Sequence, residues 1–213
     1  MALNKLKFNS LNVTPTAGKT VGFNSNADGL EATLSGGAMT FISKSTASSS
    51  STISFTSGID STYKEYMFIF KNIHAGTDGA ELTVGFRDGS TDYDATKTTT
   101  VFEAYHNEAG NDSGLAYQTA EDIAQGTGFQ NISKNLGTDN DQNAGGYLHL
   151  FNPSSTTFVK HFISRLNNIQ HNEYSLDYCV AGYCNVTAAI DAVQFKMSSG
   201  NIDAGTITLY GIN

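Results

Sequence analysis

Histidines are the first side chains to consider for chemistry, because a histidine can bind a metal or move a proton near neutral pH. None of them belongs to an HExxH or HxH pattern, the spacings that bring two ring nitrogens to one metal. On a strand, His149 would share one face with Tyr147 and Phe151, and His161 would share one face with Ile163. This pattern predicts half-exposed histidines that pack across strands, with no metal and no cofactor bound. The five histidines are His74, His106, His149, His161 and His171.

The two cysteines, Cys179 and Cys184, are five residues apart. On a regular strand an odd offset places two side chains on opposite faces. A direct disulfide would therefore need a bulge or turn between them, which Gly182 could allow. The sequence predicts two free thiols and leaves the pairing open. A zinc site would need two further ligands, and none stands nearby.

Oxygen-bearing side chains alternate in the segment 88–94 (DGSTDYD), as they do in calcium loops. The glycine is misplaced for a calcium loop, however. Thr99 also stands where a twelve-residue EF-hand loop needs its glutamate. A solvated hairpin turn is the prediction for this segment, and whether it binds an ion stays open.

The patterns of common enzyme families are missing. The sequence has no GxSxG nucleophile elbow, no phosphate-binding P-loop and no complete dinucleotide loop. A glycosidase needs only two carboxylates that meet in space, and these leave little trace in a sequence. Such a pair could come from several acidic residues, but their spacing selects no two of them. We therefore expect a non-enzymatic protein. The acidic residues are Glu103, Glu108, Glu121 and Asp122.

The charge balance argues against two classes of partner. The chain has 12 Lys and Arg against 20 Asp and Glu, a formal net charge of −8. Nucleic acids bind proteins through lysine and arginine at the phosphates, so no nucleic-acid partner is expected. Anionic membranes are disfavoured for the same reason. No apolar stretch approaches the roughly 20 residues of a membrane helix, and residues 1–8 lack the apolar core of a secretory signal.

Composition and periodicity predict strands. Charged residues make up 15% of the chain, and 21 glycines mark frequent turns. Many short strands with turn signals between them are typical of an antiparallel β-sandwich or jelly roll. Residues 116–125 could instead form one or two helical turns. The expected strands are 39–42, 53–56, 63–73, 81–87, 96–108, 129–132, 147–151, 158–166, one or two within 174–186, 192–197 and 206–210.

The segment 63–73 (YKEYMFIFKNI) is the most apolar of these strands. Tyr66, Phe68 and Phe70 share one parity, whereas Met67 and Ile69 share the other. Both faces are therefore apolar, which predicts a central strand with one face on the core and the other covered. At the end of the chain, the pattern predicts a turn over 201–205. The strand after it carries two apolar residues, at 207 and 209, on one face.

In the first 37 residues, apolar side chains are scattered and proline and glycine interrupt any long element. We therefore predict an N-terminal arm over 1–37 and a sandwich domain over 38–213. The arm has too few apolar residues for a core of its own. We expect it to dock onto a neighbouring protein, and the alternative is that it folds back onto its own sandwich. The expected anchors are Leu6, Phe8, Leu11 and Val13.

The C-terminal region resembles a known family. Its sequence reads AAIDAVQF over 188–195 and GNIDAGTITLYGI over 200–212. ISF at 53–55, YMFIF at 66–70 and LFNP at 150–153 fit the same pattern. The whole is similar to small structural proteins of marine tailed phages, cyanophages included, of the tail-fibre or virion-surface type. The resemblance covers about residues 39–212.

This resemblance implies a jelly-roll-like sandwich located on the virion, often as a homotrimer beside other virion proteins. It supplies no catalytic residues, and the arm lies outside it. Self-association also suits a chain that must protect sheet edges. Two other functions stay open. One is head decoration, in which the protein cements the capsid. The other is recognition of a host surface glycan by exposed tyrosines near the loops 88–94 and 137–146.

Overall fold

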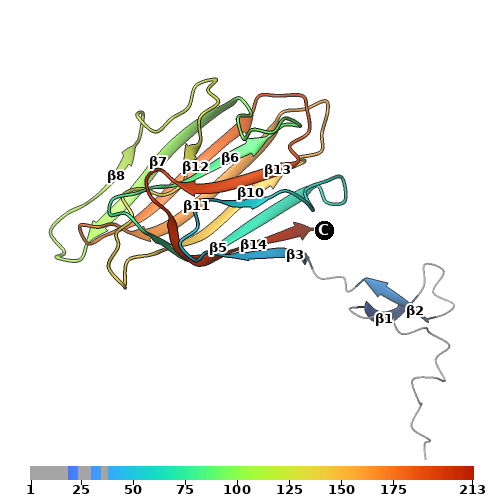
Figure 1. Ribbon diagram of the computed structural model, residues 1–213, viewed down its shortest axis with the longest axis horizontal. Helices are drawn as coiled ribbons and strands as arrows, with labels where there is room; N and C mark the ends of the chain where they lie inside the picture. Colours follow the sequence, from blue (N-terminus) through green and yellow to red (C-terminus); the bar gives the residue numbers. More distant parts are fainter. Residues whose placement is uncertain (1–18, 24–29, 35–37) are drawn as a thin grey trace, which may run out of the picture. The chain divides into compact units, whose positions relative to one another are not determined.

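The computed structural model describes residues 19–23, 30–34 and 38–213, and in these ranges the chain forms β-strands and no helix (Figure 1). The chain divides into two compact units, 1–38 and 39–213. In the first unit, β1 (Lys19–Phe23) and β2 (Leu30–Leu34) pair antiparallel as a two-stranded sheet. The predicted docking anchors Leu6, Phe8, Leu11 and Val13 lie outside the described residues.

The second unit consists of two antiparallel sheets. The smaller sheet has four strands in the spatial order β4 (Ile53–Phe55), β13 (Ala192–Met197), β6 (Leu82–Arg87) and β9 (Gln130–Asn131). The larger sheet has eight strands in the order β3 (Met39–Thr46), β14 (Ile202–Ile212), β5 (Glu65–Ala75), β10 (Ala144–Phe151), β11 (Lys160–Ile169), β12 (Tyr174–Cys184), β7 (Lys97–Asn107) and β8 (Ser113–Tyr117).

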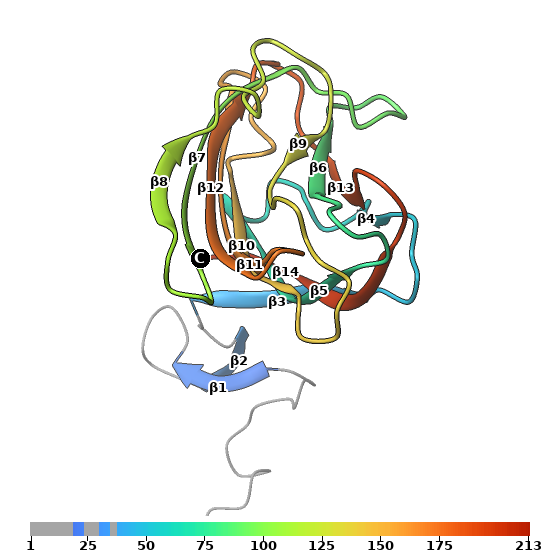
Figure 2. The same ribbon diagram turned by 90° about the vertical axis from the view of Figure 1, so that its left-hand side faces the viewer.

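The larger sheet curls around the smaller one. Figure 2 shows β7, β8 and β12 forming one wall and β3, β14 and β5 forming the floor, with the smaller sheet on the inner side. This arrangement confirms the predicted all-β, antiparallel, jelly-roll-like sandwich. Because eight strands face four, the smaller sheet cannot cover the whole inner face of the larger one.

Aromatic rings join the two sheets at the centre of the core. Phe195 of β13 lies between Phe68 and Phe70 of β5, with ring centroids 5.3 Å and 5.2 Å away. Phe55 of β4 completes the cluster at 5.3 Å from Phe68. All these contacts are edge-to-face, the geometry that aromatic quadrupoles favour by about 0.5–1.5 kcal/mol per pair. The predicted inward face of segment 63–73 is therefore confirmed.

A bulge bends β5 near its end. Asn72 adopts a positive φ of 51°, and the pairing of β5 with both neighbours shifts at this point. On β14, Gly205 lies opposite with φ 114°, where a Cβ atom would approach the carbonyl oxygen of Asn72 to 2.5 Å. Glycine is required there by both the backbone angle and the close approach. The predicted turn over 201–205 is therefore wrong, because β14 already begins at Ile202 and passes through a bulge.

The predicted helical turns over 116–125 are also wrong. β8 ends at Tyr117, and the chain then makes a single turn, in which the amide of Glu121 donates to the carbonyl of Gln118 at 3.0 Å, and follows the edge of β7. The amide of Gln118 donates to the carbonyl of Val101 at 2.9 Å, and the amide of Thr99 donates to the carbonyl of Ile123 at 2.9 Å. An exposed strand edge needs backbone partners, and this demand outweighs the weak helical pattern of the segment.

Two further expectations, for the loop 88–94 and for the outer face of β5, are wrong. The loop 88–94 is no hairpin turn, because it connects β6 of the smaller sheet with β7 of the larger one. On β5, Met67 and Ile69 point away from the core but are half-exposed, so the described part of the chain does not cover this face. The segment 174–186 contains one strand, β12, which ends at Cys184.

The cysteines lie on opposite faces of β12, as their odd spacing predicts. Cys184 is buried in the core and Cys179 is half-buried on the outer face, and both are free thiols. Burial raises the pKa of the Cys184 thiol from 9.0 to about 12.

We predict that Cys184 makes the folded protein sensitive to alkali. The unfolded thiol loses its proton near pH 9, whereas the folded thiol keeps it. The free energy of unfolding should therefore fall above pH 9, by about 1.4 kcal/mol per pH unit, and the variant Cys184→Ala should lack this contribution. Urea denaturation at about pH 8 and about pH 10 measures it. Equal pH dependence of wild type and Cys184→Ala would refute the prediction, and Cys179→Ala is the matched control.

Candidate functional site

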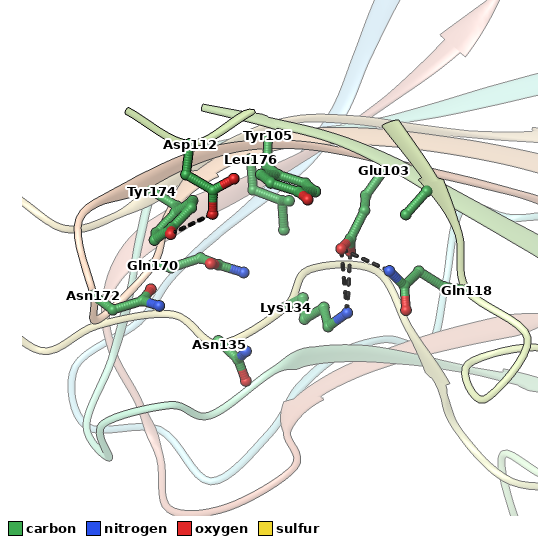
Figure 3. Close-up of a pocket in the computed structure, with 11 residues that line it drawn as sticks. Glu103, Tyr105, Asp112, Gln118, Lys134, Asn135, Gln170, Asn172, Tyr174 and Leu176 are labelled. Carbon is green, nitrogen blue, oxygen red and sulfur yellow. Dashed lines mark hydrogen bonds and ion pairs between the residues drawn. The ribbon is translucent and has the colours of Figure 1, made fainter. Parts of the chain in front are cut away.

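A polar pocket of about 340 Å³ opens on the inner side of the larger sheet. Its wall is formed by β7, β8 and β12, and its floor by the loops around residues 134–135 and 170–172 (Figure 3). Small-molecule sites usually have volumes of about 300–1,000 Å³, so this pocket suits a small ligand.

One end of the pocket holds a buried ion pair. Glu103 shares the inward face of β7 with Val101 and Tyr105, so its side chain points to the inner side. The residue is 6% exposed. Lys134 contacts both carboxylate oxygens at 3.2 Å and 3.3 Å, and Gln118 donates to one of them at 2.7 Å. A buried carboxylate needs such partners because an unpaired charge in the interior is costly.

The other end of the pocket is lined by tyrosines. The hydroxyl of Tyr174 donates to Asp112 at 2.8 Å, and this hydrogen bond, helped by burial, raises the pKa of Tyr174. The ring of Tyr105 lies 5.9 Å from that of Tyr174. Tyr105 also covers Gly114 on β8, where a Cβ atom would come within 2.7 Å of its hydroxyl. The absence of a side chain at Gly114 lets the ring lie flat along the wall.

Three amide side chains face the space between these ends (Figure 3). They belong to Asn135, Gln170 and Asn172, and no partner for their side chains is found among residues 19–23, 30–34 and 38–213. The backbone fixes their positions, because the amide of His171 donates to the carbonyl of Asn135 at 3.0 Å. The amide of Gln170 also donates to the carbonyl of Tyr174 at 2.9 Å. Asn135 adopts φ 52°, a left-handed conformation that asparagine tolerates.

The pocket therefore offers recognition more than catalysis. Its one cation, Lys134, is neutralised by Glu103. Asp112 keeps a negative charge at the other end, but it is engaged by Tyr174. The remaining groups are neutral donors and acceptors beside an aromatic wall, an arrangement that orients a polar ligand.

The acidic residues considered from the sequence do not meet in this pocket. Glu103 lines it, Glu108 is exposed, and Asp122 accepts a hydrogen bond from Tyr117. Glu121 instead approaches Glu81, because the amide of Asn131 donates to both carboxylates. Burial, followed by the charge of Glu121, raises the pKa of Glu81. The sequence did not single out Glu81, and the pocket described above does not reach this pair.

A second buried cluster lies in the core, at strand positions that pair across β7, β12 and β11. Cys184 pairs with Lys97 on one side and Lys160 on the other, and both lysines are fully buried. Each ammonium group donates to a loop carbonyl at 2.7 Å, Lys97 to Gly128 and Lys160 to Val186. Burial lowers the pKa of both lysines. We interpret these residues as ties between strands and loops.

His149 is half-exposed on a strand, as predicted, whereas His161 is exposed and His171 lies in the turn between β11 and β12. His149 contacts Glu65 across β10 and β5 and stacks on Phe151, with ring centroids 5.9 Å apart. His161 lies on the outer face beside Tyr183. In the part of the chain that the structure describes, no group of three or more His, Cys, Asp or Glu side chains is placed to hold a metal ion.

The outer face of the larger sheet carries several large exposed apolar side chains. They follow the strand register: Phe41 pairs with Tyr210, which pairs with Met67. Their exposure ranges from 36% for Tyr147 to 76% for Leu115. We call this surface the outer face and define it by Phe41, Tyr147, Ile163, Phe102, Leu115 and Tyr117.

A shallow hollow of about 410 Å³ interrupts the outer face over β7, β11 and β12. Its lining includes the small residues Ala181 and Gly182 together with the larger Ile163 and Tyr183. A surface that is both apolar and indented can receive protruding side chains of a partner.

Compared with known proteins, the sequence matches no protein-family model and no curated protein. The described residues contain no helix long and apolar enough to cross a membrane.

Sequence reasoning did not find the pocket. It pointed to tyrosines near the loops 88–94 and 137–146, whereas the pocket uses Tyr105 and Tyr174. A partial signal existed, because Glu103 and Tyr105 share the parity of Val101 in a strand. The partners of these residues come from positions 112, 134 and 170, which only the fold brings together.

We predict that the Glu103–Lys134 pair maintains the pocket wall. Lys134→Met should destabilise the protein by about 2–3 kcal/mol, because it leaves the carboxylate of Glu103 buried with only one hydrogen bond. Adding Glu103→Gln should recover most of this loss, since the charge is then removed. Thermal and urea unfolding measure both effects, and Lys71→Met, at an exposed lysine, is the control. A double variant no more stable than Lys134→Met would contradict the ion-pair interpretation.

Proposed function

We propose that this chain is a non-enzymatic structural protein of a tailed-phage virion, an appendage or tail-fibre-type module that assembles with itself and with neighbouring virion proteins. The C-terminal motif that resembles such proteins motivates the proposal. In the fold, that motif comprises β13 and β14, which lie in different sheets. The motif thus contributes to both layers of the sandwich.

The outer face is the observation that carries the proposal. An antiparallel sheet with one solvated face usually alternates apolar and polar residues. Here the outer face of β5 carries Met67 and Ile69, and large apolar side chains are also exposed on β3, β7, β8, β10 and β11. They alternate with polar groups such as the Arg165–Asp177 ion pair, and exposed apolar side chains gathered on one face can mark an interaction site. Contacts with two neighbouring copies around a three-fold axis would cover Phe41, Ile163 and their neighbours. We propose a homotrimer as the assembled form.

Head decoration remains a second candidate, since a cement protein would use the same outer face on the capsid. Mass spectrometry of purified particles tests the shared claim, and labelling of the protein on heads or tails separates the two locations. Absence of the chain from intact virions would overturn both.

The outer face should tolerate a charge in the monomer but not in the assembly. We predict that Ile163→Glu leaves the melting temperature nearly unchanged, because this side chain is 48% exposed in the isolated chain. The same glutamate buried against another copy would cost several kcal/mol, so the oligomer should dissociate. Sedimentation velocity measures the mass.

Asn140→Glu serves as the matched control, because it adds the same charge in an exposed loop of the described chain. It should leave the assembly intact. If Ile163→Glu assembles as well as this control, or if the wild type is monomeric at micromolar concentration, the outer face is not the self-association surface.

Deleting residues 2–37 should abolish incorporation into particles without unfolding the sandwich. All the core residues that the structure describes lie between Ala47 and Leu209, so the truncated chain retains them. The isolated β1–β2 pair is too small to be stable alone, and a partner would supply the missing contacts. Calorimetry of the truncated protein and its recovery from particles test this. Loss of the folded sandwich on deletion would show that the arm belongs to the core.

A further inference from the structure

Unpartnered polar groups converge in the pocket between β7, β12 and the loops beneath them. The side-chain amide of Gln170 lines the pocket and has no hydrogen-bond partner among the described residues, although the residue as a whole is only 8% exposed. The amides of Asn135 and Asn172 and the hydroxyl of Tyr105 lie around the same space, also without partners there (Figure 3).

The chemistry of these groups specifies the ligand. Each amide offers both donors and an acceptor, and a phenol offers one of each. A ligand with many hydroxyl groups satisfies such a mixed set, since each hydroxyl can also donate and accept. Tyr105 and Leu176 add an apolar wall on the side of the sheet, which suits the C–H face of a sugar ring.

The charges exclude an anionic ligand. A phosphate, sulfate or sialic acid needs a free cation, but Lys134 is held by Glu103 at 3.2 Å. Asp112, at the opposite end, would repel a negative group. The volume of about 340 Å³ is at the lower end for ligand sites and limits the occupant to a small unit.

We propose that this pocket binds a neutral saccharide unit. Gln170, Asn135 and Asn172 would hydrogen-bond its hydroxyls, and Tyr105 would pack against its ring. The glycan alternative inferred from the sequence thereby acquires a defined site, at residues that the sequence did not indicate. The inference is independent of assembly, because the pocket and the outer face lie on opposite sides of the larger sheet.

Ligand-observed saturation-transfer NMR tests the proposal with the full-length protein. The probes are the methyl pyranosides of glucose, galactose, mannose and N-acetylglucosamine at millimolar concentration, with N-acetylneuraminic acid as the anionic comparison. At least one neutral sugar should receive saturation, and the anionic sugar should not. Asn172→Ala, at an exposed position, and Gln170→Ala should each weaken binding about tenfold, the effect of losing roughly one hydrogen-bonded contact.

The matched control is Asn140→Ala, which removes an exposed asparagine amide away from this pocket and should bind like the wild type. The proposal is overturned if no neutral sugar receives saturation, if both pocket variants bind like the control, or if the anionic sugar binds better. Ile163→Glu separates this result from the assembly function, because it should lose the oligomer and retain the sugar.

Discussion

The contact of Phe195 with Phe68 and Phe70 fixes how the two sheets pack, and the other surfaces of the sandwich follow from it. This cluster places the four-stranded sheet against β5, the third strand from the β3 edge of the eight-stranded sheet. The smaller sheet then leaves the inner surface of the larger sheet uncovered near β7, β8 and β12. Polar residues occupy that surface, and loops rather than a second sheet face them. The pocket is a consequence of unequal sheet sizes.

The two-residue period of a strand separates the candidate functions. Along β7, Val101, Glu103 and Tyr105 point inward, whereas Phe102 points outward. One strand therefore contributes to the core, to the pocket and to the outer face at once. A sugar held on the inner side and a partner bound on the outer side would not compete for the same residues. This geometry would let an assembled particle present many pockets, whose weak individual affinities combine through multivalency.

Much of the fold can be predicted from the sequence because its strands obey simple periodicity. The inward parity of Tyr66, Phe68 and Phe70 and the opposite faces of Cys179 and Cys184 both follow from a period of two. Residues 116–125 fail this reasoning, because the hydrogen-bonding demand of the β7 edge decides their conformation. Gly205 forms a bulge instead of the predicted turn, since a glycine with positive φ suits either structure.

The candidate pocket could not be predicted, because its members are distant in the chain and only strand order brings them together. The buried lysines are an intermediate case. Lys97 shares the strand parity of Thr99 and Val101, and Lys160 shares that of Phe162. The inward direction of both lysines could therefore be predicted from the sequence. Nothing in the sequence identified the carbonyls of Gly128 and Val186 that make their burial possible.

The central claim is that the outer face is covered when the protein assembles. Hydroxyl-radical footprinting of the free chain at high dilution and of intact particles tests it most directly. Phe41, Phe102 and Tyr117 should be oxidised readily in the free chain and protected in the particle. Tyr93, in the loop 88–94, should change little and serves as the internal reference. Equal oxidation of the three outer-face residues in both states would contradict the account.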